Sequence, residues 1–472
     1  MKVTDLLAKI LKKNGVESVF GLQGGAVVHI FDSLIKNKIK TFFLHHEESA
    51  ALAAVANAKC TEKIGCAVVT TGPGSTNAIT GLLAAWQDSI PVIFISGQAR
   101  SNHTSYNKKV RQVGTQEVNI CDIVKPITKY TKFINKKEIV NDEINKAIRI
   151  AISGRPGPVW LDFALEIQWE NLKKYKVKKI NKTNAKTSRK NVKNIEKVIN
   201  KINSSKKPIF VIGYGVRSSG LNKDLLNNFF LKKRIPYVTT WNSADLFATK
   251  NKYNLGIIGM SGQRGANKAM FNSDLIVCVG SHLSIPHTTT LYQNYAKQAK
   301  KIIINIDEDQ LKNLNVKFDI KIKEDAKKFF EKILTKIDIK LESPLIKFKS
   351  LNWYYPKSQK KPNSNVFIRK ITEELDANSA IIIDGGGTAL YSGFQSSVLK
   401  KNARMICSSA ISSMGTGLAE TIGSFASRKF KELICIIGDG SLLMNCQDLQ
   451  SISQYKINVK IILVNNNGYL AI

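Results

Sequence analysis

The chain has 472 residues, of which 43% are hydrophobic and 23% are charged. At about 100 to 200 residues per domain this length excludes a single small module, and the composition excludes a disordered or collagen-like chain. The net charge of +35 comes from 71 Lys and Arg against 36 Asp and Glu. Because the lysines are spread through every segment and form no local patch, we interpret this charge as a compositional bias and expect no nucleic-acid partner.

The seven cysteines show no CxxC spacing and lie mostly in apolar runs such as LIVCVG. This pattern predicts buried thiols of a reducing compartment, and it argues against disulfides or zinc ligands. No stretch approaches 18 apolar residues, and the N-terminal segment lacks the apolar core of a signal peptide. We therefore expect a cytoplasmic protein with no membrane partner.

Residues 1–168 alternate helical periods with short apolar strands: TDLLAKILKKNG, SVFGL, TFFLH, SAALAAVANAKC and GCAVVTT. Such alternation predicts a parallel sheet covered by helices on both faces. The following residues, 169–190, are polar and basic without an apolar period, which is typical of a linker.

Two further units follow, at 191–345 and 365–472, with a proline- and lysine-rich linker at 346–364 between them. Strands are expected at PIFVIGYG, PYVTTW, DLIVCVGS and KIIINIDED, and then at AIIIDGGG, ARMICSS, LICIIGDG and VKIILVNNN. The predicted fold class is therefore α/β, with three doubly wound parallel-sheet domains. Because the sequence stops at Ile472, just after a strand and a turn, we expect the third domain to be incomplete.

The most specific local signal is a Gly-Asp-Gly turn. Asp439 follows an apolar strand, and Asn466 lies 27 residues later, at the end of the next strand. Parallel strands present their carboxyl ends at one edge of the sheet, where ligands of doubly wound sheets bind. Carboxylate and amide oxygens suit Mg²⁺, and a helix starting near Ser441 would direct its positive end at a phosphate. The alternative is a tight strand-to-helix turn followed by an Asn-rich hairpin.

At these residues the sequence resembles the thiamine diphosphate enzymes, and within them the acetolactate synthase (acetohydroxyacid synthase) large-subunit family. The resemblance covers the whole chain in the family's order: VFGLQGGAVVHIFDSL, HHEESAALAAVANAKC, TTGPGSTNAITGLLAAWQDSIPVIFISGQ, GRPGPVWLDF, SSMGTGLAETIGS and GDGSLLMNCQDLQ. It implies pyrimidine-binding, central and diphosphate-binding domains. The implied reaction is decarboxylation of a 2-oxo acid such as pyruvate and ligation to a second carbonyl, as in branched-chain amino acid biosynthesis.

The resemblance assigns catalytic roles to three residues. Glu47 would hydrogen-bond the ring nitrogen of the cofactor's aminopyrimidine, work that needs a buried carboxylate at short range. The alternative for Glu47 is a solvated charge at a helix cap, the role we assign to its neighbour Glu48. Met414 would hold the cofactor's rings in a bent form, although an isolated Met is more often core filler. Gln116 matches the glutamine of the family's Phe-Gln-Glu motif, with Thr115 in place of Phe.

The resemblance also implies the cofactor-binding residues and the metal ligands. The cofactor, thiamine diphosphate, would contact Gly24, Gly25, Thr70, Pro73, Asn77, Gly386, Gly387, Thr388, Met414, Gly438, Asp439, Gly440, Ser441 and Asn466. The Mg²⁺ ligands would be Asp439, Asn466 and Gly468. His45 and His46 also stand beside Glu47, but adjacent side chains point in opposite directions on a strand, so we do not expect them to form a metal pair.

In this family the cofactor binds between subunits, with Glu47 from one chain and Asp439 and Asn466 from its partner. The resemblance therefore implies a homodimer or homotetramer, with a regulatory small subunit as a further partner and a small 2-oxo acid as substrate.

Three segments depart from the family. The family's Asp-Val-Gly-Gln-His-Gln is DGGGTA at 384–389, without the Gln and His side chains. Its Ala-Arg-Phe-Asp-Asp-Arg, whose last Arg binds the acceptor carboxylate, is SHLSIP at 281–286. Its Tyr-Pro before Gly24 is Leu22 and Gln23. Another keto acid or a sugar-derived acceptor therefore stays open, as does an inactive truncated fragment. FAD also stays open as a further cofactor, because Gly213, Tyr214 and Gly215 keep part of a glycine turn.

Overall fold

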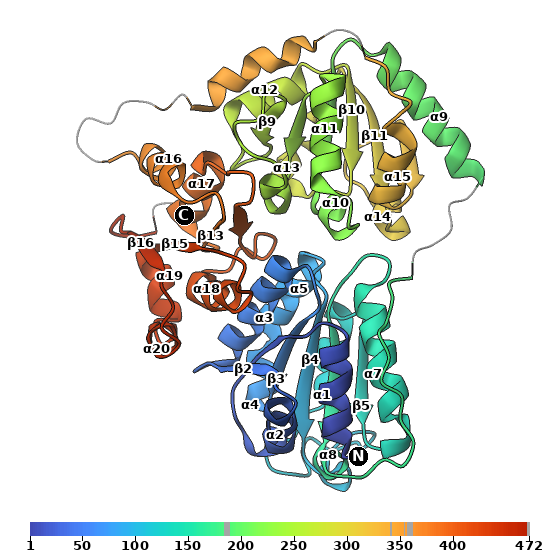
Figure 1. Cartoon of the computed structure of the whole chain (residues 1–472), viewed down its shortest axis with the longest axis vertical. Coiled ribbons are helices and arrows are strands. Elements are labelled where there is room, and N and C mark those ends of the chain that lie inside the picture. The colour runs from blue at the N-terminus through green and yellow to red at the C-terminus, as the bar shows by residue number, and fades with distance from the viewer. Residues whose placement is uncertain (184–188, 340–341, 354, 356–361, 470–472) are drawn as a thin grey trace.

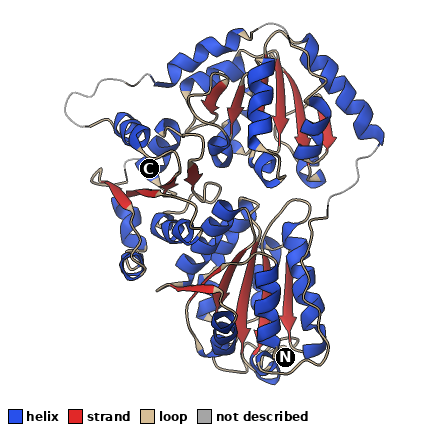
Figure 2. Ribbon diagram, viewed as in Figure 1, coloured by secondary structure: helices blue, strands red, loops and turns tan. Residues whose placement is uncertain are grey.

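A computed structural model describes residues 1–183, 189–339, 342–353, 355 and 362–469 (Figure 1). Three α/β units follow one another, and in each of them helices cover a parallel sheet (Figure 2). The predicted fold class is thereby confirmed. In the described part of the chain, no helix is long and apolar enough to cross a membrane.

The first unit has a six-stranded sheet in the order β2-β1-β3-β4-β6-β5, with all pairings parallel. Its strands are β1 (Ser18–Gly21), β2 (Lys40–Phe43), β3 (Gly65–Val69), β4 (Val92–Gln98), β5 (Tyr130–Ile134) and β6 (Val159–Ala164). Its helices are α1 (Val3–Lys13), η1 (Gly25–Val27), α2 (Val28–Lys36), α3 (Glu47–Thr61), α4 (Pro73–Asn77), α5 (Ile79–Gln87), η2 (Ser101–His103), α6 (Ile120–Val124), η3 (Lys125–Ile127), α7 (Lys137–Ile152) and α8 (Leu165–Gln168).

The central unit repeats this architecture in the order β12-β11-β10-β7-β8-β9. Its strands are β7 (Pro208–Ile212), β8 (Tyr237–Thr239), β9 (Asn254–Ile257), β10 (Leu275–Val279), β11 (Lys300–Asn305) and β12 (Ile320–Lys323). Its helices are α9 (Arg189–Ser204), α10 (Tyr214–Ser218), α11 (Lys223–Lys233), η4 (Trp241–Leu246), α12 (Arg264–Phe271), α13 (Ile285–Thr288), η5 (Tyr292–Asn294), α14 (Glu308–Lys312), α15 (Ala326–Ile333) and η6 (Pro344–Trp353).

The third unit has a four-stranded parallel sheet in the order β14-β13-β15-β16. Its strands are β13 (Ser379–Ile383), β14 (Arg404–Ile406), β15 (Glu432–Gly438) and β16 (Lys460–Val464). Its helices are α16 (Ser364–Glu374), α17 (Gly387–Ser396), α18 (Thr416–Ala426), α19 (Asp439–Met444) and α20 (Asp448–Gln454).

The segments expected to be linkers contain helical structure at their edges. η6 occupies most of the first half of the second one, where packing of Leu345 into the central core outweighs the polar composition. Part of each linker, residues 184–188, 354 and 356–361, lies outside the described residues. The predicted domain boundaries stay predictions.

The first and third domains share one hydrophobic core, and α3 joins them. This alanine-rich helix is buried on nearly all sides and packs along α18. A helix that is apolar all round belongs in a core, and small side chains allow its backbone to come close to a neighbour. At Gly423 a Cβ atom would lie 2.1 Å from the carbonyl oxygen of Ala53, so only glycine fits there.

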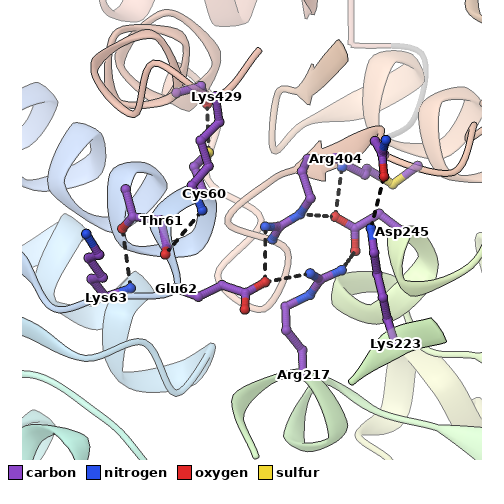
Figure 3. Close-up of polar contacts among 12 residues, drawn as sticks. Cys60, Thr61, Glu62, Lys63, Arg217, Lys223, Asp245, Arg404 and Lys429 are labelled. Atoms are coloured by element: carbon purple, nitrogen blue, oxygen red, sulfur yellow. Dashed lines mark hydrogen bonds and ion pairs between the residues drawn. The ribbon is translucent and has the colours of Figure 1, made fainter. Parts of the chain in front are cut away.

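Four charged side chains tie the three domains together at a second point (Figure 3). Asp245 of η4 lies 2.5 Å from both Arg217 of α10 and Arg404 of β14. Glu62, which ends α3, lies 2.8 Å from Arg217 and 3.6 Å from Arg404. Burial alone would raise the pKa of Asp245, but the two guanidinium groups outweigh burial and hold that pKa below its usual value.

We expect Asp245→Ala to lower the free energy of unfolding by about 3–5 kcal/mol, because the change leaves two buried arginines sharing one partly exposed carboxylate. Thermal unfolding followed by circular dichroism measures this loss. The control is Asp224→Ala. It removes an exposed ion pair between the central and third domains, with Lys401 at 3.3 Å, and should lower the free energy of unfolding by under about 1 kcal/mol. Equal midpoints for the two variants would contradict the assignment of a domain-joining role to Asp245.

Candidate functional site

Glu47 is the first residue of α3 and is 7% exposed. Its Oε2 accepts a hydrogen bond of 3.1 Å from Asn77 Nδ2, whereas its Oε1 makes no hydrogen bond within the described residues. The helix is capped by His46, whose Nδ1 accepts from the backbone N–H of Glu48. Two expectations were therefore wrong: the histidines lie in the turn after β2 and not on a strand, and His46, not Glu48, is the cap.

A tight turn between β3 and α4 lies against the carboxylate of Glu47. Thr70 precedes the turn, and Pro73 is the first residue of α4, the position that suits its missing N–H. A Cβ atom on Gly74 would lie 3.3 Å from Glu47 Oε1, and one on Gly24 would lie 2.5 Å from Thr70 Cβ. The chain thus brings these residues together with Asn77 in a narrow space around one carboxylate oxygen. Gly25 follows at the start of η1.

Gln116 lies against the same turn. The hydroxyl of Thr71 is 3.1 Å from its carbonyl oxygen, and a Cβ atom on Gly72 would come within 2.4 Å of that oxygen. Gly72 itself has φ +64°, which glycine alone adopts without strain. The structure therefore places Gln116 beside the turn that carries Pro73 and Asn77.

Asp439 and Asn466 follow neighbouring strands of the third sheet. β15 pairs in parallel with β16, with Gly438 opposite Val464, so the two side chains leave the same edge. Asn466 Nδ2 donates to Thr388 Oγ1 at 3.1 Å, which adds the start of α17 to the group. The expected side-by-side arrangement of the two strand ends is present.

The glycines at 386–387 form a cradle at the N-terminus of α17. A Cβ atom on Gly386 would lie 2.5 Å from Met414 Cγ and 3.4 Å from Ser441 Oγ, so a side chain would fill the space above the helix end. Met414 also lies against Gly440, whose Cβ would be 3.4 Å from Met414 Cε. The methionine is therefore shared by the cradle and the Gly-Asp-Gly turn.

Asp384 holds these loops in place from below. Its carboxylate accepts hydrogen bonds from the backbone of Gly386 at 3.3 Å and of Gly417 at 3.0 Å. Burial raises the pKa of Asp384. The segment that has lost the family's Gln and His side chains thus keeps a backbone able to bind phosphate, with free N–H groups at a helix N-terminus.

The described residues contain no cluster of three or more His, Cys, Asp or Glu side chains arranged as metal ligands. A magnesium ion here would need Asp439, the amide oxygen of Asn466, a backbone carbonyl such as that of Gly468, and oxygens of a diphosphate. This donor set is of the hard oxygen type that Mg²⁺ prefers, completed by substrate or cofactor phosphates.

Polar contacts do not connect the two groups of residues within the described part of one chain. Across the described part of the structure, no hydrogen bond or ion pair joins the group around Glu47 to the group around Asp439. Beside the second group, apolar side chains face solvent, with Leu443 74%, Met444 51% and Leu463 47% exposed. The half of the candidate site around Asp439 therefore has an exposed apolar surface beside it.

A cavity of about 640 Å³ lies where the central domain meets the other two. Tyr214 and Gly215 line it after β7, and Gly213 precedes them as the N-cap of α10. His282 and His287 line it after β10, and burial lowers the pKa of both, that of His287 to about 3. Segment 281–286 therefore places no cation in the cavity at neutral pH.

Sequence reasoning missed two contributors to the site. His46 is the cap of α3, a role that was not predicted, although a turn residue just before a helix is a recognisable signal. Tyr469 lies with its hydroxyl 3.2 Å from the position that a Cβ on Gly440 would occupy. Because Tyr469 follows the Asn-rich strand end that carries Asn466, its position in the sequence could have predicted that it lies near the site.

Comparisons with known proteins give matches along the whole chain. Three family models match: the "Thiamine pyrophosphate enzyme, N-terminal TPP binding domain" at residues 1–123, the central domain at 195–333 and the C-terminal TPP binding domain at 386–472. Thiamine pyrophosphate is another name for thiamine diphosphate. A probable acetolactate synthase large subunit of Methanocaldococcus jannaschii is 30% identical, covering 99% of this chain and 80% of the relative. The acetolactate synthase large subunit of Haemophilus influenzae is also 30% identical, covering 98% and 82%.

Two expectations gain no support from these matches. The C-terminal model matches residues 386–472 and gives no support to an incomplete third domain. None of the descriptions of these models and relatives names a flavin, so FAD is not supported either. The matched domains and the relatives agree with each other, and the chain belongs to the thiamine pyrophosphate enzyme family, as an enzyme of the acetolactate synthase large-subunit type.

Proposed function

We propose that this protein is a thiamine diphosphate- and magnesium-dependent carboligase that decarboxylates pyruvate and joins the remaining two-carbon unit to a second carbonyl compound. The observation that carries the proposal is the pairing of β15 with β16, which sets Asp439 and Asn466 side by side above the glycine cradle. The relatives' names give acetolactate synthesis as the reaction type.

The residues present fit the cofactor in both halves of the site. One half offers a buried carboxylate with an unused oxygen, Glu47 Oε1, in a narrow glycine-lined space. The other offers backbone N–H groups at the start of α17 and the oxygen ligands Asp439 and Asn466. When bound, thiamine diphosphate supplies an electron sink for the carbanion that remains after a 2-oxo acid loses carbon dioxide.

The side chains of the protein would position the cofactor and hold the proton at its aminopyrimidine ring. Glu47 would hold a proton at the aminopyrimidine ring, and Asn77 orients the Glu47 carboxylate by its hydrogen bond of 3.1 Å. Asp439 and Asn466 would hold Mg²⁺, and the cradle at 386–387 would bind phosphate oxygens. Met414 packs between the cradle and the Gly-Asp-Gly turn, where it would contact the bound cofactor. Gln116 faces the substrate.

The acceptor is the least constrained part of the proposal. Segment 281–286 carries no arginine or lysine, and the lowered pKa of His282 leaves its imidazole neutral. A carboxylate-bearing acceptor would therefore lack a cation from this segment. A neutral carbonyl acceptor, such as an aldehyde derived from a sugar, is the second candidate on this observation.

We further propose that two chains assemble so that Glu47 of one faces Asp439 of the other. The exposed Leu443, Met444 and Leu463 beside the diphosphate half support such an interface, because a partner would cover them. A dimer or a dimer of dimers, with a regulatory small subunit, would match the relatives' designation as large subunits. All seven cysteines are free and six are buried, which supports a reducing compartment such as the cytoplasm.

The test is incubation of the purified protein with pyruvate, thiamine diphosphate and Mg²⁺, followed by measurement of carbon dioxide and products. Pyruvate alone should yield one carbon dioxide and one acetolactate for every two pyruvates consumed. Carbon dioxide release without acetolactate, together with a mixed product on adding an aldehyde, would favour the second candidate. No carbon dioxide from pyruvate or other 2-oxo acids would contradict the proposal.

A further inference from the structure

A buried carboxylate lies beneath the loop that carries Gln116. Asp162, on β6, is fully buried. Its Oδ1 accepts a hydrogen bond of 2.6 Å from Ser96, and its Oδ2 accepts from Gln98 Nε2 at 3.0 Å and from the hydroxyl of Tyr106 at 3.1 Å. A carboxylate with three donors and no cation is an unusual group to bury, because burial raises its pKa, here to about 6.

Gln98 carries this network to the segment around Gln116. Its Nε2 also donates to the carbonyl oxygen of Val118 at 2.8 Å. Its Oε1 lies 2.8 Å from the hydroxyl of Thr71, which in turn lies 3.1 Å from the carbonyl oxygen of Gln116. The single hydroxyl proton of Thr71 can serve either acceptor. Gln98 therefore contacts Val118 directly and is linked to Gln116 through Thr71, while Glu117 between those two residues is buried.

Tyr106 holds the N-terminal part of the loop between Tyr106 and Cys121 against the sheet. Its ring stacks on Phe133 of β5, with centroids 4.3 Å apart and an interplanar angle of 5°. Its hydroxyl also accepts from the backbone N–H of Cys121 at 3.3 Å. Between these attachments the loop is exposed, and it includes Lys108, Lys109 and Arg111.

Gln116 adopts a conformation that needs such support. Its φ of +57° lies in the left-handed region, which is uncommon for a residue with a side chain and persists where the surroundings hold it. Its carbonyl oxygen is held between Thr71 and the bare α-carbon of Gly72.

We infer that Asp162 is a positioning residue for Gln116: through Gln98, Thr71 and Tyr106 it fixes the loop so that Gln116 stays against the turn facing Glu47. The inference rests on the proposed function only in taking Gln116 to face the substrate. Asp162 is not assigned a contact with substrate or cofactor. Its carboxylate acts by holding the hydrogen-bond donors Ser96, Gln98 and Tyr106 in fixed positions.

Tryptic cleavage after Lys108, Lys109 and Arg111 tests the network without any activity. Asp162→Asn keeps the side chain's size but replaces one acceptor oxygen with a donor, and it should speed cleavage about tenfold, since hydrogen bonds to a charged group are lost. Tyr106→Phe, which removes one donor, should speed cleavage less. The control is Tyr130→Phe, which loses a hydroxyl bound to Glu143 elsewhere on β5 and should be cleaved at the wild-type rate. Unchanged cleavage in both Asp162→Asn and Tyr106→Phe would overturn the inference.

Kinetics then separate positioning from a general loss of structure. Asp162→Asn should lower kcat as far as Gln116→Ala does, with the KM for thiamine diphosphate unchanged, and combining the two should cause no further loss. Losses that multiply in the double variant would overturn the inference. If the wild-type protein shows no thiamine-dependent turnover, the proposed function fails, whereas the cleavage rates still decide whether the network holds the loop.

Discussion

Glu47→Gln is expected to lower kcat by about a hundredfold to ten-thousandfold, the range for loss of a positioned acid or base. The amide keeps the size of the side chain and can still accept from Asn77, so the fold should be unaffected. It cannot share a proton with the aminopyrimidine as a carboxylate does. Turnover of pyruvate measures the loss, and hydrogen–deuterium exchange at the reactive carbon of bound thiamine diphosphate measures it without a substrate.

The matched control for this variant is Glu48→Gln. Glu48 is the next residue on the same helix turn, half-buried, and its backbone N–H is the one that His46 caps. The change should leave kcat and the exchange rate within about twofold, because the Glu48 side chain makes no hydrogen bond within the described residues and is assigned no contact with the cofactor. Equal activity of Glu47→Gln and the wild type, in folded protein, would remove Glu47 from the mechanism.

Asp439→Ala is expected to weaken magnesium-dependent binding of thiamine diphosphate by at least about a hundredfold, equivalent to about 2.7 kcal/mol. The change removes the only carboxylate among the proposed metal ligands, and Asn466 and Gly468 offer neutral oxygens alone. Isothermal titration calorimetry with excess Mg²⁺ measures the affinity. Asp376→Ala, at an exposed turn before β13, is the control and should bind as the wild type does. Wild-type affinity in Asp439→Ala would place the metal elsewhere.

Mixing these two inactive variants tests the arrangement between chains. If Glu47 and Asp439 act across an interface, a mixed dimer of Glu47→Gln and Asp439→Ala chains has one site with both residues intact. Coexpression with two different tags, followed by tandem purification, should therefore restore up to about half of the wild-type activity per dimer. Mixed dimers as inactive as their parents would show that each site draws both residues from one chain.

Local patterns were enough to predict the α/β class and the neighbouring strand ends that carry Asp439 and Asn466. Apolar strands followed by glycine turns are short-range signals, and parallel sheets place such turns at one edge. The assignment of Glu47 and Asn77 to one site came only from the family resemblance, and the hydrogen bond between them was not predicted.

Interactions between distant segments could not be predicted in this way. Asp245 meets Arg404 only because the central and third domains pack together, and none of Asp245, Arg217 and Arg404 has a distinctive sequence context. Asp162 lies in a strand whose other residues are apolar. Its three hydrogen-bond donors come from other segments of the chain, so the sequence around Asp162 could not predict them. The two histidines before Glu47 were assigned to a strand because the predicted strand TFFLH runs to His45. The observed strand β2 ends two residues earlier, at Phe43.

The most direct test of the account is thermal unfolding of the purified protein titrated with thiamine diphosphate, with and without Mg²⁺. A ligand at about a hundred times its dissociation constant stabilises the folded state by about 2.7 kcal/mol, so micromolar binding gives a clear rise in the midpoint. We predict that rise only when both are present, and none when Mg²⁺ is replaced by a chelator. An unchanged midpoint at millimolar thiamine diphosphate with Mg²⁺ would contradict the account.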